Sequence, residues 1–576
     1  MKNKKTAIII LLIIIIIAII ATITTKKIQK ENRKYEIAQI TEYKYFVLKE
    51  NDKYGVINTQ GETIIEPKYE DIKIPNPEKA IFICYENNST KILNDKREQI
   101  YTQYQDIQPL RLTNVISDLM YEKTTLKYSQ DEKYGIIDID GKKITDPIYE
   151  EINTLQFKEG ELLVKKDGKY GIINIKGTTL VKPQYDGIEV DKYYEEATGY
   201  KKSGYIVKQT TDEGYRYGYV NIDGKQIMDN KYNDLYRITD IDSQDVYIIC
   251  AENGKYGLFK NGKKVIENEY QALTYNQSNN TITALKGKKY GVISIDGNTL
   301  VPFEYKQIDT TGEYIYAKTE EENTQIFDSK GKEANINSDT AILNVENTEY
   351  KIHIETKQGK TIYKIYKNDT DITKNEDYIY VEYLYDNYFI ACNSEGKLGI
   401  IDDNNKTKVE FNYNSIQKID GTNLIQTVKN DTNTVEIYSK ELTKITELKN
   451  ATIEKKENYI RLYNNDEIKY VTEEGKEVKN TQLLKDNKIF ASKNNGKWGF
   501  VDKNGNIAIG YDYEYVTEVN QYGFAGIKQN GLWGVVDSEG KIVVKPKYKL
   551  NDTEPTFIGE YYQVTYGNGE RYYTNM

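Results

Sequence analysis

Apolar and polar positions divide the chain into two regions of different character. Residues 7–25 form an uncharged run dominated by Ile and Leu. A helix over this run, at about 1.5 Å per residue, spans roughly the 30 Å hydrocarbon core of a bilayer. After residue 40, short apolar stretches alternate with turn residues, and no amphipathic helical period persists. The pattern predicts one membrane-spanning helix followed by a domain made almost entirely of β-strands.

The long second region is an internal repeat. Clear copies, such as KYGVINTQGETIIEPKYEDI at 53–72 and KYGIINIKGTTLVKPQYDGI at 169–188, usually open on Lys, an aromatic residue and Gly. A second Gly or an Asn follows six residues after the motif Gly, and a Tyr follows fourteen residues after it; both intervals are one shorter in the copy at 255–273. With degenerate copies included, fourteen units recur about every 37 residues, with the motif Gly position at 55, 90, 135, 171, 218, 257, 291, 325, 364, 399, 435, 469, 499 and 534.

Each unit predicts four short strands. The aromatic–Gly strand ends in a D-x-x-G or N-x-x-G hairpin turn, a second strand returns to the repeat Tyr, and two more strands precede the next unit. We predict an all-β fold of propeller-like rings, with an open β-hairpin solenoid as the alternative, because closure removes the exposed edges of a long β-array. The units divide into two sets of seven, residues 35–308 and 309–576. The C-terminal residues predict a further hairpin, which either caps a solenoid or completes a blade with residues 35–48.

The N-terminal run is interpreted as an uncleaved signal anchor. It is long for the apolar region of a signal peptide, and no persuasive small-residue cleavage site follows it, although a cleaved signal peptide is the alternative. Lys2, Lys4 and Lys5 favour a cytoplasmic tail at residues 1–6, although basic residues in the linker at 26–34 compete with them. The prediction is a single-pass protein of the cell membrane, held in the bilayer by residues 7–25, with its repeats outside the cytoplasm.

Charge and rare residues exclude several classes of function. The chain carries 79 basic and 88 acidic side chains, a net charge of -9, which argues against nucleic acid as a partner. The single histidine, His353, rules out sites that need two histidines, and no nucleophile motif surrounds it. Cys84, Cys250 and Cys392 are odd in number, and the last two occupy a position that other copies fill with small apolar residues. We therefore expect cysteines in the core rather than redox or metal groups.

With these motifs established, the chain resembles the WG-repeat (KWG-like) proteins of bacteria. The likeness rests on Lys497-Trp498-Gly499 and Leu532-Trp533-Gly534, each followed by the D-x-x-G turn, and on the P-x-Y element of the better-preserved copies; Tyr replaces Trp in most copies. It covers roughly residues 35–576. The resemblance implies a β-rich repeat domain that is often surface-associated or membrane-anchored, and it brings no general set of catalytic residues.

Two recurring residue types are candidates for chemistry, and each has a structural interpretation beside the functional one. Motif aromatics pack between units, or they stack on the sugar rings of a cell-wall polymer; they are Tyr54, Tyr134, Tyr170, Tyr217, Tyr256, Tyr290, Trp498 and Trp533. Turn acids belong to ordinary hairpin turns, or they bind calcium; they are Asp138, Asp140, Asp223, Asp296 and Asp502. Periodic residues usually follow from a periodic fold, so the structural interpretation is preferred and no catalytic, cofactor or metal site is assigned.

Segments that depart from the repeat pattern indicate a functional surface better than the periodic residues do. The units near 309–390 and 417–485 have lost the motif Gly, either by drift or because they carry a partner surface. The longest insertions, near 112–132 and 189–214, are expected to be exposed binding loops. The leading hypothesis is a non-enzymatic, extracytoplasmic module that binds protein or cell-wall glycan. The alternative is a cell-envelope hydrolase or modifying enzyme that uses carboxylates; a sensor is disfavoured because only six residues precede the apolar run.

Overall fold

The computed structural model describes residues 40–576 apart from 113–119, 157, 196–198, 239–244, 313, 335–339, 346–347, 358, 369, 375, 430, 457, 485–486 and 553. The predicted tail, membrane helix and linker therefore lie outside the described residues. Within the described part of the chain, no helix is long and apolar enough to cross a membrane.

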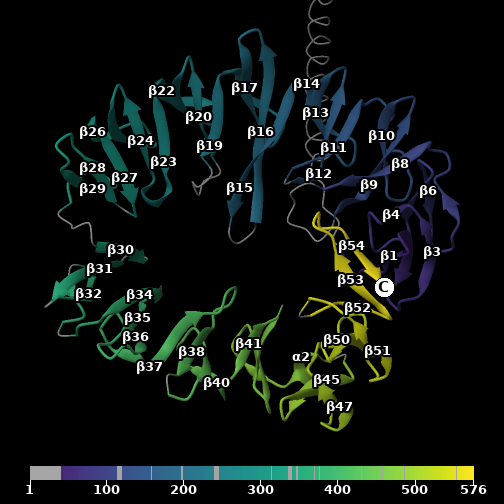
Figure 1. The fold of residues 1–576 in the computed structure, drawn as a ribbon. Coiled ribbons are helices and arrows are strands. Elements are labelled where there is room, and N and C mark those ends of the chain that lie inside the picture. Colours follow the sequence, from purple (N-terminus) through teal and green to yellow (C-terminus); the bar gives the residue numbers. More distant parts are fainter. Residues whose placement is uncertain are drawn as a thin grey trace, which may run out of the picture. The chain divides into compact units, whose positions relative to one another are not determined.

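The described chain is built almost wholly of small antiparallel sheets (Figure 1), as the sequence predicts. One sheet shows the pattern: β11 (Glu151–Leu155), β12 (Lys158–Lys166), β13 (Lys169–Asn174) and β14 (Thr179–Tyr185) pair in chain order. The β13–β14 turn contains Gly177 at a φ of 78°, and the Asn174 side chain accepts hydrogen bonds from the backbone N–H groups of Lys176 and Thr178. Helical structure in the described residues is confined to η1 (Gln277–Asn279) and α2 (Asn480–Leu483).

The motif Gly is required by the close approach of the two strands of the hairpin. A Cβ atom on Gly171 would lie 2.5 Å from the backbone N of Pro183 and 2.7 Å from the carbonyl O of Val181, where the register between β13 and β14 shifts. No larger side chain fits at that distance without moving backbone atoms. The motif Gly and the P-x-Y strand thus occur together, because that strand can approach so closely only where the facing residue has no side chain.

The spacing of fourteen residues fixes the register of the hairpin. The motif aromatic residue and the repeat Tyr are Cα partners, for example Tyr170 with Tyr185 and Trp533 with Tyr548. The nine repeat tyrosines of the clear copies are all buried: Tyr69, Tyr149, Tyr185, Tyr232, Tyr270, Tyr305, Tyr413, Tyr513 and Tyr548. A degenerate copy keeps the same register, since Tyr363 pairs with Tyr378.

Sheet boundaries are offset from the sequence unit. In the regular units a sheet begins just after one repeat Tyr and ends at the next, as the sheet of β11 to β14 does between Tyr149 and Tyr185, so the two strands that follow a Tyr belong to the next sheet. After Tyr69, which ends β3 (Thr63–Tyr69), the new sheet contains β4 (Asp71–Lys73), β5 (Phe82–Glu86), β6 (Ser89–Leu93) and β7 (Gln99–Ile100).

The structure divides into two compact units, residues 1–308 with 564–576, and residues 309–563. In the first unit, β1 (Tyr45–Glu50), β2 (Lys53–Asn58) and β3 form a sheet whose free side is taken by the C-terminal strand β54 (Arg571–Thr574). The strand β54 runs parallel to β1, with Leu48 opposite Tyr573. The C-terminal hairpin therefore joins the sheet that contains β1.

In the second unit, β34 (Tyr380–Tyr385), β35 (Tyr388–Cys392), β36 (Leu398–Asp402), β37 (Thr407–Lys418), β38 (Ile425–Lys429), β39 (Thr434–Tyr438) and β40 (Lys444–Lys449) form one seven-stranded sheet. Two successive repeats share it because β37 continues past its repeat Tyr413 without a break. The predicted boundary between these two units of sequence is therefore absent from the hydrogen-bonded sheet.

Three details of the sequence interpretation require correction. In the degenerate copy of residues 90–104 the partner of Cys84 is Lys91, so the motif Gly position is 91 rather than 90. Cys392 lies opposite Leu398, and Ala391 is the residue opposite Gly399, so Cys392 is one place away from the position of Cys250. The predicted insertion loops are largely strand.

These insertions form parts of β9 (Tyr121–Gln130), β15 (Gly187–Glu195) and β16 (Gly199–Thr211). Alternating apolar residues such as Tyr205 and Val207 are buried in the core, which extends the pairing beyond the length of an ordinary unit. Residues 113–119 and 196–198 lie outside the described chain, so the tips of both insertions are not assigned.

Candidate functional site

The motif aromatic rings are covered by the apolar core and by lysine side chains. Trp498 and Trp533 are each 1% exposed, and the tyrosines at this position are half-buried. A lysine on the neighbouring strand lies over several of these rings: Lys49 over Tyr54 at 5.5 Å, Lys165 over Tyr170 at 5.2 Å, Lys493 over Trp498 at 5.2 Å and Lys528 over Trp533 at 5.4 Å from the ring centroid. These contacts support the structural interpretation of the motif aromatics over sugar stacking.

Turn acids hold the hairpins together. Asp138 Oδ1 accepts hydrogen bonds from the backbone N–H groups of Asp140 and Lys142, and Asp502 Oδ1 accepts them from Asn504 and Asn506. Asn174 fills the same role in another copy, which explains why Asp and Asn alternate at this position. Among the described residues, no group of three His, Cys, Asp or Glu side chains is arranged to hold a metal ion.

The cysteines are buried and unpaired, as expected of core residues. Burial raises the pKa of the Cys84 thiol and of the Cys250 thiol to about 12. Thiols with such pKa values are protonated at neutral pH and are poor nucleophiles and metal ligands. Cys84 and Cys250 therefore serve as small apolar core residues.

A buried ionic cluster occupies one of the degenerate units. Arg461, in β42 (Tyr459–Tyr463), is fully buried and pairs with Tyr470 across the sheet; the corresponding residues in regular sheets are apolar, as with Leu163 and Ile249. Its guanidinium donates to Glu454 at 2.5 and 3.0 Å, to Glu518 at 3.3 Å and to the Tyr515 hydroxyl at 2.7 Å. Sequence reasoning missed this cluster, although a lone Arg inside the apolar stretch YIRLY was its signal.

Surrounding groups complete the neutralisation of this cluster. Glu554 lies 3.6 Å from Arg461 and also contacts Lys456, which pairs with Glu454 at 3.2 Å. The guanidinium lies 5.3 Å from the ring centroid of Trp498 and 5.5 Å from that of Tyr463. The charge of Arg461 is thus balanced by carboxylates, and hydroxyl groups and aromatic ring faces complete its contacts inside the packed sheets.

Glu454 in this cluster lacks the raised pKa that the general acid of a glycosidase needs. A general acid needs a carboxyl whose pKa is raised so that it holds a proton near neutral pH. Burial pushes the pKa of Glu454 up, but the charge of Arg461 and its hydrogen bonds outweigh burial and leave that pKa below its ordinary value. Glu454 is therefore an ionised partner of Arg461 at neutral pH.

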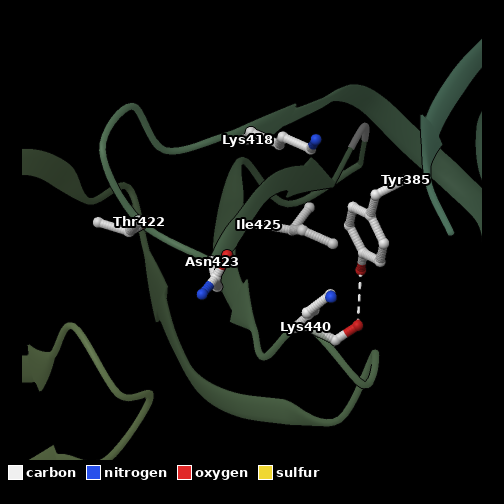
Figure 2. Close-up of a pocket in the computed structure, with 6 residues that line it drawn as sticks. All are labelled: Tyr385, Lys418, Thr422, Asn423, Ile425 and Lys440. Atoms are coloured by element: carbon white, nitrogen blue, oxygen red, sulfur yellow. Dashed lines mark hydrogen bonds between the residues drawn. The ribbon is translucent and has the colours of Figure 1, made fainter. Parts of the chain in front are cut away.

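A small open pocket lies at the end of the seven-stranded sheet (Figure 2). It has a volume of about 160 Å³ and is lined by Tyr385, Lys418, Thr422, Asn423, Ile425 and Lys440. These residues come from the two degenerate regions that the sequence identifies, near 309–390 and 417–485. The pocket is thus placed where the repeat pattern is weakest.

Two lysines converge on one aromatic ring in this pocket. The Nζ atoms of Lys418 and Lys440 lie 5.1 and 5.8 Å from the centroid of the Tyr385 ring. The Tyr385 hydroxyl donates a 2.7 Å hydrogen bond to the backbone O of Lys440, and the fully buried Ile425 lies beside the ring (Figure 2). The wall of the pocket formed by Tyr385 and Ile425 is held in place by these contacts, whereas the charged ends of the two lysines can change position.

The serial sheets and their shared register define a β-repeat protein. The family model described as "WG containing repeat" matches residues 54–83, 134–170, 170–205, 498–533 and 533–550. The chain thus carries WG-containing repeats at these five places, as its KWG-like motifs predict. No curated protein matches the sequence.

Several solved structures share limited similarity. The computationally designed Ika8 protein is 10% identical, with a TM-score of 0.18, and the match covers 57% of this chain and 94% of that one. A eukaryotic initiation factor is 10% identical, with a TM-score of 0.20 and coverage of 71% and 96%. PorZ, a surface component of the type-IX secretion system of Porphyromonas gingivalis, is 8% identical, with a TM-score of 0.16 and coverage of 88% and 82%. Similarities of this size bear on neither ligand nor activity.

Proposed function

We propose that this protein is a membrane-anchored, extracytoplasmic binding module that recognises protein or cell-wall glycan and catalyses no reaction. The observation that carries the proposal is the pocket around Tyr385, which opens where the repeat departs from its pattern. Binding residues are commonly placed on irregular segments that a rigid scaffold positions. The regular sheets, with their buried Tyr and Trp residues, supply that scaffold.

The electrostatics of two acids, Glu454 and Asp403, support binding over the alternative of a carboxylate-dependent envelope enzyme. Glu454 has a lowered pKa beside Arg461. Asp403 likewise has a lowered pKa, because hydrogen bonds from Lys367, Asn387 and Tyr350 outweigh the effect of burial. Both carboxyls are held ionised by fixed partners, whereas acid–base catalysis requires a carboxyl poised to exchange a proton near neutral pH.

Incubation with purified, protein-free bacterial cell wall tests this function. We expect the purified full-length protein to sediment saturably with wall and to release no soluble sugar if the ligand is glycan. If the ligand is protein, the wall stays unbound, and cross-linking in intact cells yields a defined partner. Release of soluble wall fragments that increases with time would contradict the proposal and favour the hydrolase.

The proposed location rests on the sequence of the first 34 residues. Residues 7–25 would anchor the protein in the bilayer, and Lys2, Lys4 and Lys5 would keep the short tail inside. Protease added to intact cells is expected to digest the repeats. Complete protection of the repeats in cells that remain intact would place them on the cytoplasmic side instead.

For the architecture we propose propeller-type closure, in which the pairing of β54 with β1 joins the two ends of the repeat region. Removal of residues 564–576 would then open the structure and increase its radius of gyration in small-angle scattering. An unchanged radius of gyration in a folded truncation would favour the open solenoid.

A further inference from the structure

We propose that the pocket lined by Tyr385, Lys418, Asn423 and Lys440 binds a single small anionic group, a carboxylate or a phosphate, on the ligand of this protein. The inference rests on the proposed binding function and specifies the chemistry that the pocket recognises. Neither the sequence motifs nor the family match assigns a ligand to these residues.

Charge is the first argument. The two ammonium groups lie 5.1 and 5.8 Å from one ring centroid, so they are at most about 11 Å apart. Lys440 is partly neutralised by Asp386 at 3.2 Å. For Lys418, no carboxylate among the described residues lies within 4.0 Å, and its contact is the Tyr385 ring. Asp386 and Glu441, whose charges add to the effect of burial in raising the pKa of the Tyr385 hydroxyl, offset the charge of Lys440, so the positive charge that an anion would neutralise is chiefly that of Lys418.

Donors at the rim are the second argument. The exposed Asn423 amide makes no hydrogen bond among the described residues, so its NH₂ group is available to a ligand. The Thr422 hydroxyl is already used, because it donates to Ile419 O at 2.8 Å and accepts from Leu424 N–H at 3.1 Å. It holds the 419–424 turn that carries Asn423. Two ammoniums and one amide make a donor set for an oxyanion.

Tyr385 contributes shape rather than charge. Burial raises the pKa of its hydroxyl, which is further held by the carbonyl of Lys440, so the ring stays neutral at physiological pH. Tyr388 packs edge-on against it at 5.7 Å between centroids. The neutral, fixed ring forms an apolar wall, and the Nζ atoms of both lysines lie near it, as Figure 2 shows.

Size is the third argument. A volume of about 160 Å³ is smaller than the roughly 300–1,000 Å³ of pockets that enclose drug-sized ligands. The pocket therefore accommodates one charged substituent, while the rest of a polymer or protein ligand would run over the open surface. Such a site recognises a charged group and does not distinguish the sequence of the polymer or protein that carries it.

Calorimetric titration of the purified full-length protein tests the inference, with sodium phosphate and sodium glucuronate as probes. We expect saturable binding of at least one probe and a loss of about tenfold in affinity in Lys418→Gln, with a larger loss when Lys440→Gln is added, as expected for the removal of charge-assisted hydrogen bonds. Phosphate binding alone would indicate a phosphorylated ligand, and glucuronate binding alone a carboxylated one.

A matched control is Lys165→Gln, which removes a lysine that also lies over a tyrosine ring, Tyr170, but outside the pocket. Both pocket lysines are exposed, so the variants should keep the parent melting curve. Asn423→Ala gives a second variant that changes no charge. Absence of binding of both probes, or affinities unchanged in the lysine variants, would overturn the inference.

This failure is distinguishable from failure of the proposed function. If Lys418→Gln still sediments with wall or still cross-links to its protein partner as the parent does, binding stands and the anionic pocket is wrong. If the probes bind the pocket but neither wall nor partner is captured, the pocket stands and the proposed function is wrong.

Discussion

The motif aromatic position shows how one residue stabilises a repeat. Trp533 is 1% exposed and packs with Val535, Val544, Tyr548 and Phe557. We expect Trp533→Ala to lower the free energy of unfolding by about 3–5 kcal/mol, the cost typical of emptying an aromatic core site. Denaturant unfolding measures this, with Ile542→Ala, at an exposed position, as the control.

A second substitution separates packing from hydrogen bonding at the same site. The Trp533 indole Nε1 is buried without a hydrogen-bond partner among the described residues. Trp533→Phe should therefore cost far less than Trp533→Ala, because it keeps an aromatic ring and removes an unsatisfied donor. Normal unfolding of Trp533→Ala together with lost ligand binding would instead make this residue part of the binding surface.

Arg461 illustrates a buried charge that its neighbours require. In Arg461→Met the three acidic side chains around it, Glu454, Glu518 and Glu554, lose their central cation. We expect a loss of about 3–5 kcal/mol in the free energy of unfolding, as for other buried ion pairs deprived of one partner. Arg97→Met, at an exposed arginine, is the control, and near-equal stability of the two variants would show that the cluster is not stabilising.

Glu436 provides a prediction about acid. It is 1% exposed, and although burial would raise its pKa, hydrogen bonds from Lys429 and from the hydroxyls of Tyr413 and Tyr438 lower that pKa to about 2. Because the folded-state pKa lies below the unfolded value, the stabilisation is complete above the unfolded pKa and is lost as the pH falls through the folded pKa.

The stability difference between the parent and Glu436→Gln should therefore be constant near neutral pH and shrink as the pH falls from about 4.5 toward about 2. Denaturant unfolding at a series of pH values measures it, with the exposed Glu395→Gln as the control. A difference independent of pH across this interval would mean that the Glu436 carboxyl is not held ionised by its neighbours.

At the scale of the elements, the C-terminal hairpin is attached by polar contacts as well as by the pairing of β54 with β1. Glu570 accepts hydrogen bonds from the Tyr121 hydroxyl at 2.9 Å, Lys73 at 3.1 Å and Arg111 at 3.4 Å. We expect Glu570→Ala to speed hydrogen exchange in residues 571–574 and in β1, while β46 (Lys497–Asp502) exchanges as before. Unchanged exchange in β1 would show that strand pairing alone holds the hairpin.

The hairpins themselves were predictable from the sequence, because their determinants are local. The motif Gly, the turn Gly or Asn and the repeat Tyr lie within fifteen residues of one another, and they fix the register of β13 with β14 and of its counterparts. The division into sheets was not predictable in the same way. A repeat has a period but no marked beginning, so the place where one sheet ends, at Tyr69 or Tyr185, is set by packing between strands rather than by the motif.

For the molecule as a whole, the all-β class followed from periodicity and the likeness to WG-repeat proteins from the KWG-like motifs, whereas the distinctive sites followed from neither. The Arg461 cluster joins Glu454 to Glu554 across a hundred residues of sequence, and the pocket joins Tyr385 to Lys440. Such contacts depend on how successive sheets pack, which no spacing in the chain specifies. The sequence did indicate the degenerate units as the region to search.

Site-specific photo-cross-linking in intact cells tests most directly whether this scaffold presents a binding site at the degenerate units. A photoreactive residue replaces the exposed Asn423 at the pocket rim, or the exposed Glu395 of a nearby turn as the control. We expect a saturable adduct to wall glycan or to one envelope protein from position 423 and none from position 395. Equal labelling at both positions, or no adduct at 423 in cells that contain the protein, would contradict it.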